Sequence, residues 1–188
     1  MPDHGRTVID IIIEDHREFE DLFRQIESTE DTEDLRRLTD TVIAELVRHA
    51  IAEEQYLYPA MREHLPDGDS IVDHEIEEHS EAEETMKEIE GMDATDPAFR
   101  DKINTLMEEI RHHLKDEEED ALPQLAEVCP HEALVELGRK VEQAKKIAPT
   151  RPHPSAPDTP PWNKILAPGA GLVDRVRDAL TGRAHGTS

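Results

Sequence analysis

Two short motifs in this chain place a histidine four residues before a glutamate. The pairs are His49–Glu53 and His113–Glu117. In a helix, residues four apart project from one face with Cβ atoms about 5–6 Å apart. An imidazole and a carboxylate placed in this way can bind one metal ion together. Nitrogen and oxygen donors without thiolate suit iron, manganese or zinc, and iron is expected where open positions meet oxygen species.

Two further histidines, His16 and His79, interrupt apolar stripes on other segments. The stripes are Ile9, Ile12, Phe19, Phe23 and Ile26 around the first, and Val72, Ile76, Met86 and Ile89 around the second. A single histidine on an apolar stripe is usually a hydrogen-bonded core residue. His49 and His113 interrupt the apolar stripes of their own segments in the same way. Four interrupted stripes would bury several polar groups together, at a cost of several kcal/mol for each unpaired charge. A cation at the centre removes that cost, so we expect two metal ions, bridged by the two glutamates.

The apolar residues recur in steps of three and four, which predicts helices throughout the first 148 residues. Thr7 with Asp10 resembles a capping box at the start of the first helix, and the second helix is expected from about residue 32. Ser70 is expected to cap the third helix, which closes at Gly91, and Asp96-Pro97 opens the fourth. Short loops between these helices predict an all-α, antiparallel up-down-up-down four-helix bundle, with a fifth helix from residue 130 covering it.

The two halves of this predicted bundle resemble each other. The pattern HxxxEExxxxP occurs twice and ends at Pro59 and Pro123. Asp15, which directly precedes His16, likewise corresponds to Glu78, which directly precedes His79. A helix hairpin used twice predicts a pseudo-two-fold axis through the bundle.

Composition limits the classes of partner. The chain has 45 acidic and 21 basic side chains, a net charge of -24, which disfavours nucleic acid and anionic membrane surfaces. It has no apolar run long enough for a spanning helix. Its N-terminus lacks the pattern of a secretory signal, and the single Cys129 excludes an internal disulfide framework. We therefore expect a cytoplasmic protein.

The composition changes near residue 149, which divides the chain into a bundle domain (1–148) and a tail (149–188). The tail holds 7 of the 13 prolines and 4 of the 8 glycines, a density that excludes a continuous helix. Residues 171–180 could form a short amphipathic helix. We interpret the tail as a strap that docks on the domain or on a protein partner, with a disordered tail as the alternative.

The histidine and glutamate pattern resembles the hemerythrin-like HHE cation-binding family over residues 7–126. The resemblance implies a non-haem di-iron centre with an oxo bridge, whose ligands would be His16, His49, Glu53, His79, His113 and Glu117. It also implies reaction with a small oxidant, for which hydrogen peroxide decomposition is our first hypothesis and nitric oxide a further substrate. The alternatives are a non-enzymatic protein that binds or senses oxygen or iron, and a structural or zinc-binding bundle.

Helix three departs from the pattern of oxygen-carrying hemerythrins, which have HxxxH there. In this chain His74 and His79 are five residues apart, so a regular helix turns His74 roughly 140° away from His79. His74 reaches the site only if the helix is widened, as in a π-bulge, and on that expectation we include it among the predicted metal ligands. As a ligand it would saturate one iron, as in an oxygen carrier. If it faces water instead, both ions keep open positions, which suits peroxide.

Tyr56 lies one turn past Glu53 on the same stripe. Its hydroxyl is a candidate to hydrogen-bond a metal ligand or a reacting oxygen. The alternative is an amphipathic core residue without a role in the chemistry.

Overall fold

The computed structural model describes residues 5–148, and this part of the chain forms five helical rods without a β-strand. The first rod is α1 (Val8–Ser28), the third is α4 (Gly68–Gly91) and the fifth is α7 (His131–Ile147). The second rod joins α2 (Thr32–Ala52), η1 (Glu53–Leu57) and α3 (Tyr58–His64). The fourth joins α5 (Pro97–Asp116), η2 (Glu117–Ala121) and α6 (Leu122–Val128).

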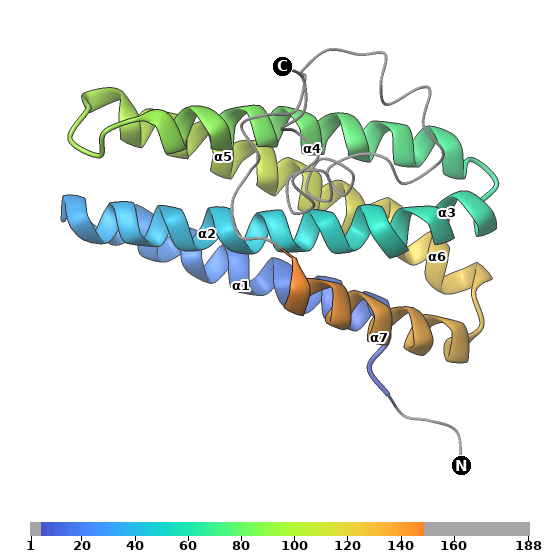
Figure 1. Ribbon diagram of the computed structural model, residues 1–188. Helices are drawn as coiled ribbons and strands as arrows, with labels where there is room; N and C mark the ends of the chain where they lie inside the picture. The colour runs from blue at the N-terminus through green and yellow to red at the C-terminus, as the bar shows by residue number, and fades with distance from the viewer. Residues whose placement is uncertain (1–4, 149–188) are drawn as a thin grey trace, which may run out of the picture.

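Figure 1 shows the rods that begin with α1, α2, α4 and α5 running antiparallel to their neighbours along the chain, with α7 lying along α1 and α2. The predicted four-helix bundle with a fifth covering helix is therefore confirmed. The predicted tail, with its amphipathic helix at 171–180, lies outside the described residues. Within residues 5–148, no helix combines the length and the apolar character needed to span a bilayer.

Capping residues begin the helices largely where the sequence predicts. The Thr7 hydroxyl accepts from the Asp10 backbone N–H at 3.2 Å, and the Asp10 carboxylate accepts from the Thr7 backbone N–H at 2.9 Å. This is the predicted capping box. The predicted cap of the third helix, Ser70, is wrong by three residues, because Asp67 is the N-cap and its carbonyl already accepts a helical hydrogen bond from the Ile71 N–H.

Two of the rods contain a π-helical turn, η1 and η2. In η1 the Tyr58 N–H donates to the Glu53 carbonyl, and in η2 the Leu122 N–H donates to the Glu117 carbonyl, five residues back in each case. A proline stands two residues after the end of each turn, and a proline has no N–H to offer the carbonyl four residues earlier. Each wide turn begins at one of the two predicted bridging glutamates.

The apolar core divides into two clusters. One includes Phe19, Phe23 and Ile103, and the other includes Ile12, Leu57 and Leu125. Along α1, α4 and the rod that begins with α5, a histidine or glutamate separates the residues of one cluster from those of the other, and along α2 the change falls between His49 and Glu53. A buried polar layer therefore lies between the two apolar clusters.

Candidate metal centre

Four histidines of the predicted ligand set meet in this polar layer as two pairs. His16 on α1 faces His49 on α2 with ring centroids 5.3 Å apart, and His79 on α4 faces His113 on α5 at 4.7 Å. The Nε2 atoms of His79 and His113 are 3.1 Å apart. Two nitrogens bound at about 2.1 Å to one ion, at a right angle, lie about 3.0 Å from each other. The second pair thus has the spacing of two imidazoles on one metal ion.

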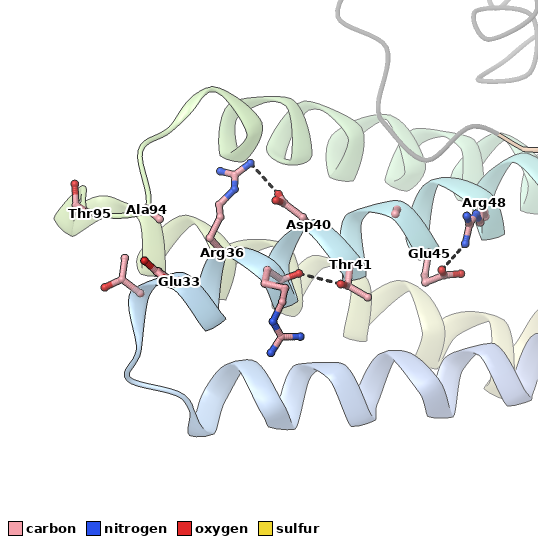
Figure 2. Close-up of a pocket in the computed structure, with 11 residues that line it drawn as sticks. Glu33, Arg36, Asp40, Thr41, Glu45, Arg48, Ala94 and Thr95 are labelled. Carbon is pink, nitrogen blue, oxygen red and sulfur yellow. Dashed lines mark hydrogen bonds and ion pairs between the residues drawn. The ribbon is translucent and has the colours of Figure 1, made fainter.

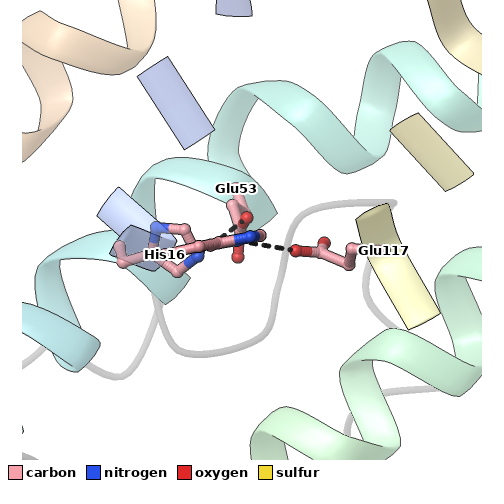
Figure 3. A group of neighbouring side chains, drawn as sticks. His16, Glu53 and Glu117 are labelled. Carbon is pink, nitrogen blue, oxygen red and sulfur yellow. Dashed lines mark ion pairs between the residues drawn. The ribbon is translucent and has the colours of Figure 1, made fainter. Parts of the chain in front are cut away.

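Glu53 and Glu117 each reach both histidine pairs. Glu53 Oε1 lies 3.0 Å from His49 Nε2, and its Oε2 lies 3.4 Å from His79 Nε2. Glu117 Oε2 lies 3.4 Å from His16 Nε2 and 3.7 Å from His113 Nε2. Figure 3 shows His16, Glu53 and Glu117 pointing toward one another from three helical rods. This arrangement is compatible with the predicted bridging role of both glutamates.

Each of the four imidazoles turns its Nδ1 atom toward a carboxylate on another helical rod. The pairs are His16–Glu118 at 2.8 Å, His49–Asp15 at 3.1 Å, His79–Glu54 at 3.1 Å and His113–Glu78 at 3.1 Å. Such a partner fixes the orientation of the ring and leaves Nε2 to bind a metal. The pairing follows the sequence repeat, because Asp15 and Glu78 each precede a histidine of the layer, while Glu54 and Glu118 each follow a glutamate of the layer.

Glu75 is a third carboxylate of the layer, which the sequence prediction missed. The residue is 3% exposed, and its Oε2 lies 3.0 Å from His113 Nδ1 without a hydrogen-bond partner in the described chain. Glu75, His113 and Glu117 can offer ligand atoms that all lie within 4.8 Å of one another. A signal was available, because Glu75 stands three residues after Val72 and four before His79 on the apolar stripe of α4.

The tyrosine in the layer is Tyr58 rather than the predicted Tyr56. Tyr58 is 1% exposed, its hydroxyl oxygen lies 3.0 Å from His79 Nε2, and the hydroxyl donates to Glu117 Oε1 at 3.4 Å. Tyr56 is half-buried and packs against the apolar cluster beyond the layer. The prediction assumed a regular helix after Glu53. In the wide turn of η1 the Tyr58 N–H donates to the Glu53 carbonyl, so Tyr58, five positions after Glu53, lies next to it along the helix.

The structure places His74 outside the layer. Its side chain is 55% exposed, and its Nε2 lies 3.7 Å from Glu78 Oε1 on the surface. The widening that would turn His74 inward is absent from α4, which is a regular α-helix from Gly68 to Gly91. The π-helical turns occur instead in the second and fourth rods, where they begin at Glu53 and Glu117.

The carboxylates make the layer favourable for positive charge. Burial acts to lower the pKa of His49, but Glu53 and Asp15 outweigh it and raise that pKa to about 10. Burial opposes ionisation of His113 too, yet Glu117 and other carboxylates raise its pKa well above the ordinary value. Imidazole binds a metal in its neutral form. A metal ion therefore competes with protons for binding to the imidazoles of this negatively charged layer.

Several donor atoms of the layer have no hydrogen-bond partner within residues 5–148. They are His16 Nε2, His49 Nε2, both carboxylate oxygens of Glu53, Glu75 Oε2 and Glu117 Oε2. A buried polar atom left unpaired costs about 1–3 kcal/mol, and a cation bonded to these atoms removes that cost. Imidazole nitrogens with carboxylate oxygens suit iron, manganese or zinc. The residues present therefore fit a metal centre.

A small cavity touches the layer from the side of the first apolar cluster. Three histidines line it, His49, His79 and His113, together with the apolar residues Leu46, Ala50, Ala82, Met86, Ile110 and Leu114. The space open to the centre of a water-sized molecule is about 20 Å³, and one water needs roughly 10–15 Å³ by that measure. The cavity admits a molecule of very few atoms and excludes an organic substrate.

A larger hollow of about 820 Å³ lies on the outer face of α2 and shares no lining residue with the layer. Figure 2 shows two of its basic side chains paired, Arg36 with Asp40 at 2.8 Å and Arg48 with Glu45 at 2.5 Å. The third, Arg37, pairs with Asp34 at 2.9 Å. No histidine or cysteine is among the described residues that line this open, charge-paired hollow, so it does not resemble a metal site.

Comparisons with known proteins agree with this geometry. The family model of the hemerythrin HHE cation binding domain matches residues 7–125. An uncharacterised hemerythrin-like protein of Schizosaccharomyces pombe is 29% identical over 174 residues, which cover 92% of this chain and 86% of that protein. A DNA nickase of Nostoc sp. is 28% identical over 112 residues, which cover 60% of this chain but 31% of the nickase.

The fold also matches a crystal structure of a hemerythrin HHE cation binding domain-containing protein from Mycobacterium kansasii. The TM-score is 0.66 at 23% identity, over 75% of this chain and 88% of that one. At this identity the likeness concerns the fold.

Proposed function

We propose that this chain, which belongs to the hemerythrin HHE cation-binding family, holds two iron ions in its buried layer and decomposes hydrogen peroxide there. His16 and His49 would hold one ion, and His79 and His113 the other. Glu53 and Glu117 would bridge the two ions, since each lies within 4 Å of a histidine from both pairs.

The observation that carries the choice of peroxide is that α4 presents Glu75, and not His74, to the buried layer. A histidine four residues before His79, as in the HxxxH pattern of oxygen carriers, would give one ion a third imidazole. Here the residue four before His79 is Glu75, buried beside His113 and Glu117. An additional anionic oxygen donor stabilises a more highly charged metal ion, which favours oxidation chemistry over reversible oxygen carriage.

Iron bound in the layer would supply the electron exchange of the reaction, in which one peroxide is oxidised to dioxygen and a second is reduced to two waters. The chain's own residues select the substrate and handle the proton. The cavity beside the layer admits a molecule as small as peroxide, and apolar side chains form most of its lining. The Tyr58 hydroxyl contacts His79 and Glu117, so it is positioned to donate a hydrogen bond to an oxygen held beside these two residues.

The test combines a metal count with a peroxide assay on one preparation of the full chain. We expect two iron ions per chain and dioxygen release from hydrogen peroxide. Glu75→Ala should lower peroxide turnover, whereas Glu77→Ala is the matched control, because Glu77 lies on the same helix but is exposed.

Two outcomes would contradict the proposal. A loaded protein that binds dioxygen reversibly and leaves peroxide intact would support the oxygen-binding alternative instead. Consumption of nitric oxide without peroxide turnover would assign the centre to that other small oxidant.

A further inference from the structure

A second cluster of metal-binding side chains lies on the solvent-facing side of α4 and α5. It consists of His74 and Glu78 on α4 and of His112 and Asp116 on α5. Each helix contributes a histidine and, four residues later, a carboxylate, so each pair projects from one helix face. The buried layer uses the same spacing, but peroxide decomposition in that layer leaves these two surface histidines without a role.

His74, Glu78 and Asp116 can each offer a ligand atom within 4.8 Å of the others, and His112 lies beside two of the three, Glu78 and Asp116. Glu78 Oε1 lies 2.9 Å from His112 Nδ1 and 3.7 Å from His74 Nε2, while Asp116 Oδ2 lies 3.6 Å from His112 Nδ1. Donors at about 2.1 Å around a tetrahedral ion are about 3.4 Å apart. The side chains of His74 and His112 are 55% and 65% exposed, so an ion in solution can reach both.

Glu78 connects this surface cluster to the buried layer. While its Oε1 faces His112, its Oε2 accepts from His113 Nδ1 at 3.1 Å. The carboxylate of Glu75 lies on the same Nδ1 atom at 3.0 Å, and it belongs to the group that includes Glu117. A series of carboxylates, from Asp116 through Glu78 and Glu75 to Glu117, therefore leads from solvent into the layer.

At the α1–α2 histidine pair the corresponding carboxylates are paired with bases instead. There Asp15 and Glu118 contact the imidazoles of α1 and α2, and Lys145 and Arg17 pair with these two carboxylates. Both bases repel an incoming cation.

We propose that His74, Glu78, His112 and Asp116 form an iron-loading site, which captures a ferrous ion from solution and passes it by way of Glu75 to the buried layer. Two imidazoles with two carboxylates suit Fe²⁺ and bind Zn²⁺ by the same chemistry. The net charge of -24 raises the local concentration of cations at this surface. The inference rests on the proposed function in one respect, that the buried layer is the destination of the iron.

The first measurement is a Zn²⁺ titration of the iron-loaded full chain, with released iron counted in parallel. The wild type should bind one additional Zn²⁺ ion without releasing iron. Loss of one residue outside a metal's own ligands already costs about 10–100-fold in affinity, so His74→Ala/His112→Ala should lose at least about tenfold. The matched control is His64→Ala/His131→Ala, which removes two exposed histidines elsewhere on the bundle and should bind the additional ion normally.

The second measurement follows uptake of Fe²⁺ by the metal-free full chain without oxygen, as iron that a ferrous chelator no longer removes. The His74→Ala/His112→Ala variant should reach the iron content of the wild type several-fold more slowly, and the control variant should not differ from the wild type. Equal Zn²⁺ affinity in the variant and wild type, or equal uptake rates, would overturn the loading site. A wild type that binds Zn²⁺ at the surface but retains no iron would instead refute the proposed function, and the loading role with it.

Discussion

Asp15 tests whether the outer carboxylates support the metal centre. This residue is 5% exposed; its Oδ2 accepts from His49 Nδ1 at 3.1 Å, and its Oδ1 pairs with Lys145 of the covering helix α7. Burial acts to raise the pKa of Asp15, but the hydrogen bonds from His49 and Lys145 outweigh it and hold that pKa below the ordinary value. The acceptor is therefore a charged carboxylate at neutral pH.

Asp15→Ala should weaken metal binding by about 10–100-fold, which corresponds to about 1.4–2.8 kcal/mol. The lost hydrogen bond corresponds to a similar figure, because His49 is 3% exposed and its Nδ1–H would lose its acceptor, at about 1–3 kcal/mol. Asp15→Asn keeps an acceptor oxygen without the charge, so it should lose less affinity than the alanine variant.

The assay is competition for iron between the protein and a chelator of known affinity, read as metal per chain at equilibrium. Asp21→Ala is the control, because Asp21 lies on the same helix and its side chain is 66% exposed. If Asp15→Ala and Asp21→Ala retain both ions equally well, the carboxylate on His49 does not support the metal, and the reasoning for all four outer carboxylates fails.

Three other predictions concern the glutamates, the tyrosine and one glycine. Glu53→Ala and Glu117→Ala should each reduce the metal count below two per chain by elemental analysis, because each carboxylate lies near both histidine pairs; full loading of either variant would show that it is not a bridge. Tyr58→Phe should keep the metal count but slow dioxygen release from peroxide, and unchanged turnover would remove its hydroxyl from the mechanism. Gly68→Ala should destabilise the fold by about 1–3 kcal/mol in denaturant unfolding, since its Cβ would lie 2.3 Å from the Met61 carbonyl oxygen.

Sequence reasoning succeeds where the determining interaction is local. Thr7 with Asp10, and Asp96 with Pro97, begin helices through contacts within three residues of each other, so their spacing alone predicts the helix start. The apolar stripes predict which faces meet, because burial of apolar area follows the helical period. The same stripes are sufficient to predict that the four histidines and two glutamates share one layer.

Sequence reasoning fails where the helical period changes. The choice of Tyr56 depends on counting 3.6 residues per turn past Glu53, and η1 changes that count. Pro59 and Pro123 mark more than the sequence repeat, because a proline inside a helix removes a hydrogen bond and so indicates a local change of geometry. The widened turn that would bring His74 inward is expected in helix three, whereas that helix is regular and presents Glu75 to the layer instead.

The repeat predicts two equivalent halves, and the departures from it show how the halves differ. Asp15 and Glu78 occupy matching positions, yet Asp15 pairs with Lys145 of the covering helix while Glu78 contacts the exposed His112. Tyr58 likewise corresponds to Leu122, an apolar residue. The phenol, the third carboxylate Glu75 and the solvent-facing cluster therefore all contact the α4–α5 histidine pair. A centre built from equivalent halves would treat its two ions alike, whereas here one pair is enclosed by α7 and the other has the polar groups that can admit an ion and hold a proton. If the proposed centre forms, this asymmetry would give the structural role to the His16–His49 half and the reactive role to the His79–His113 half.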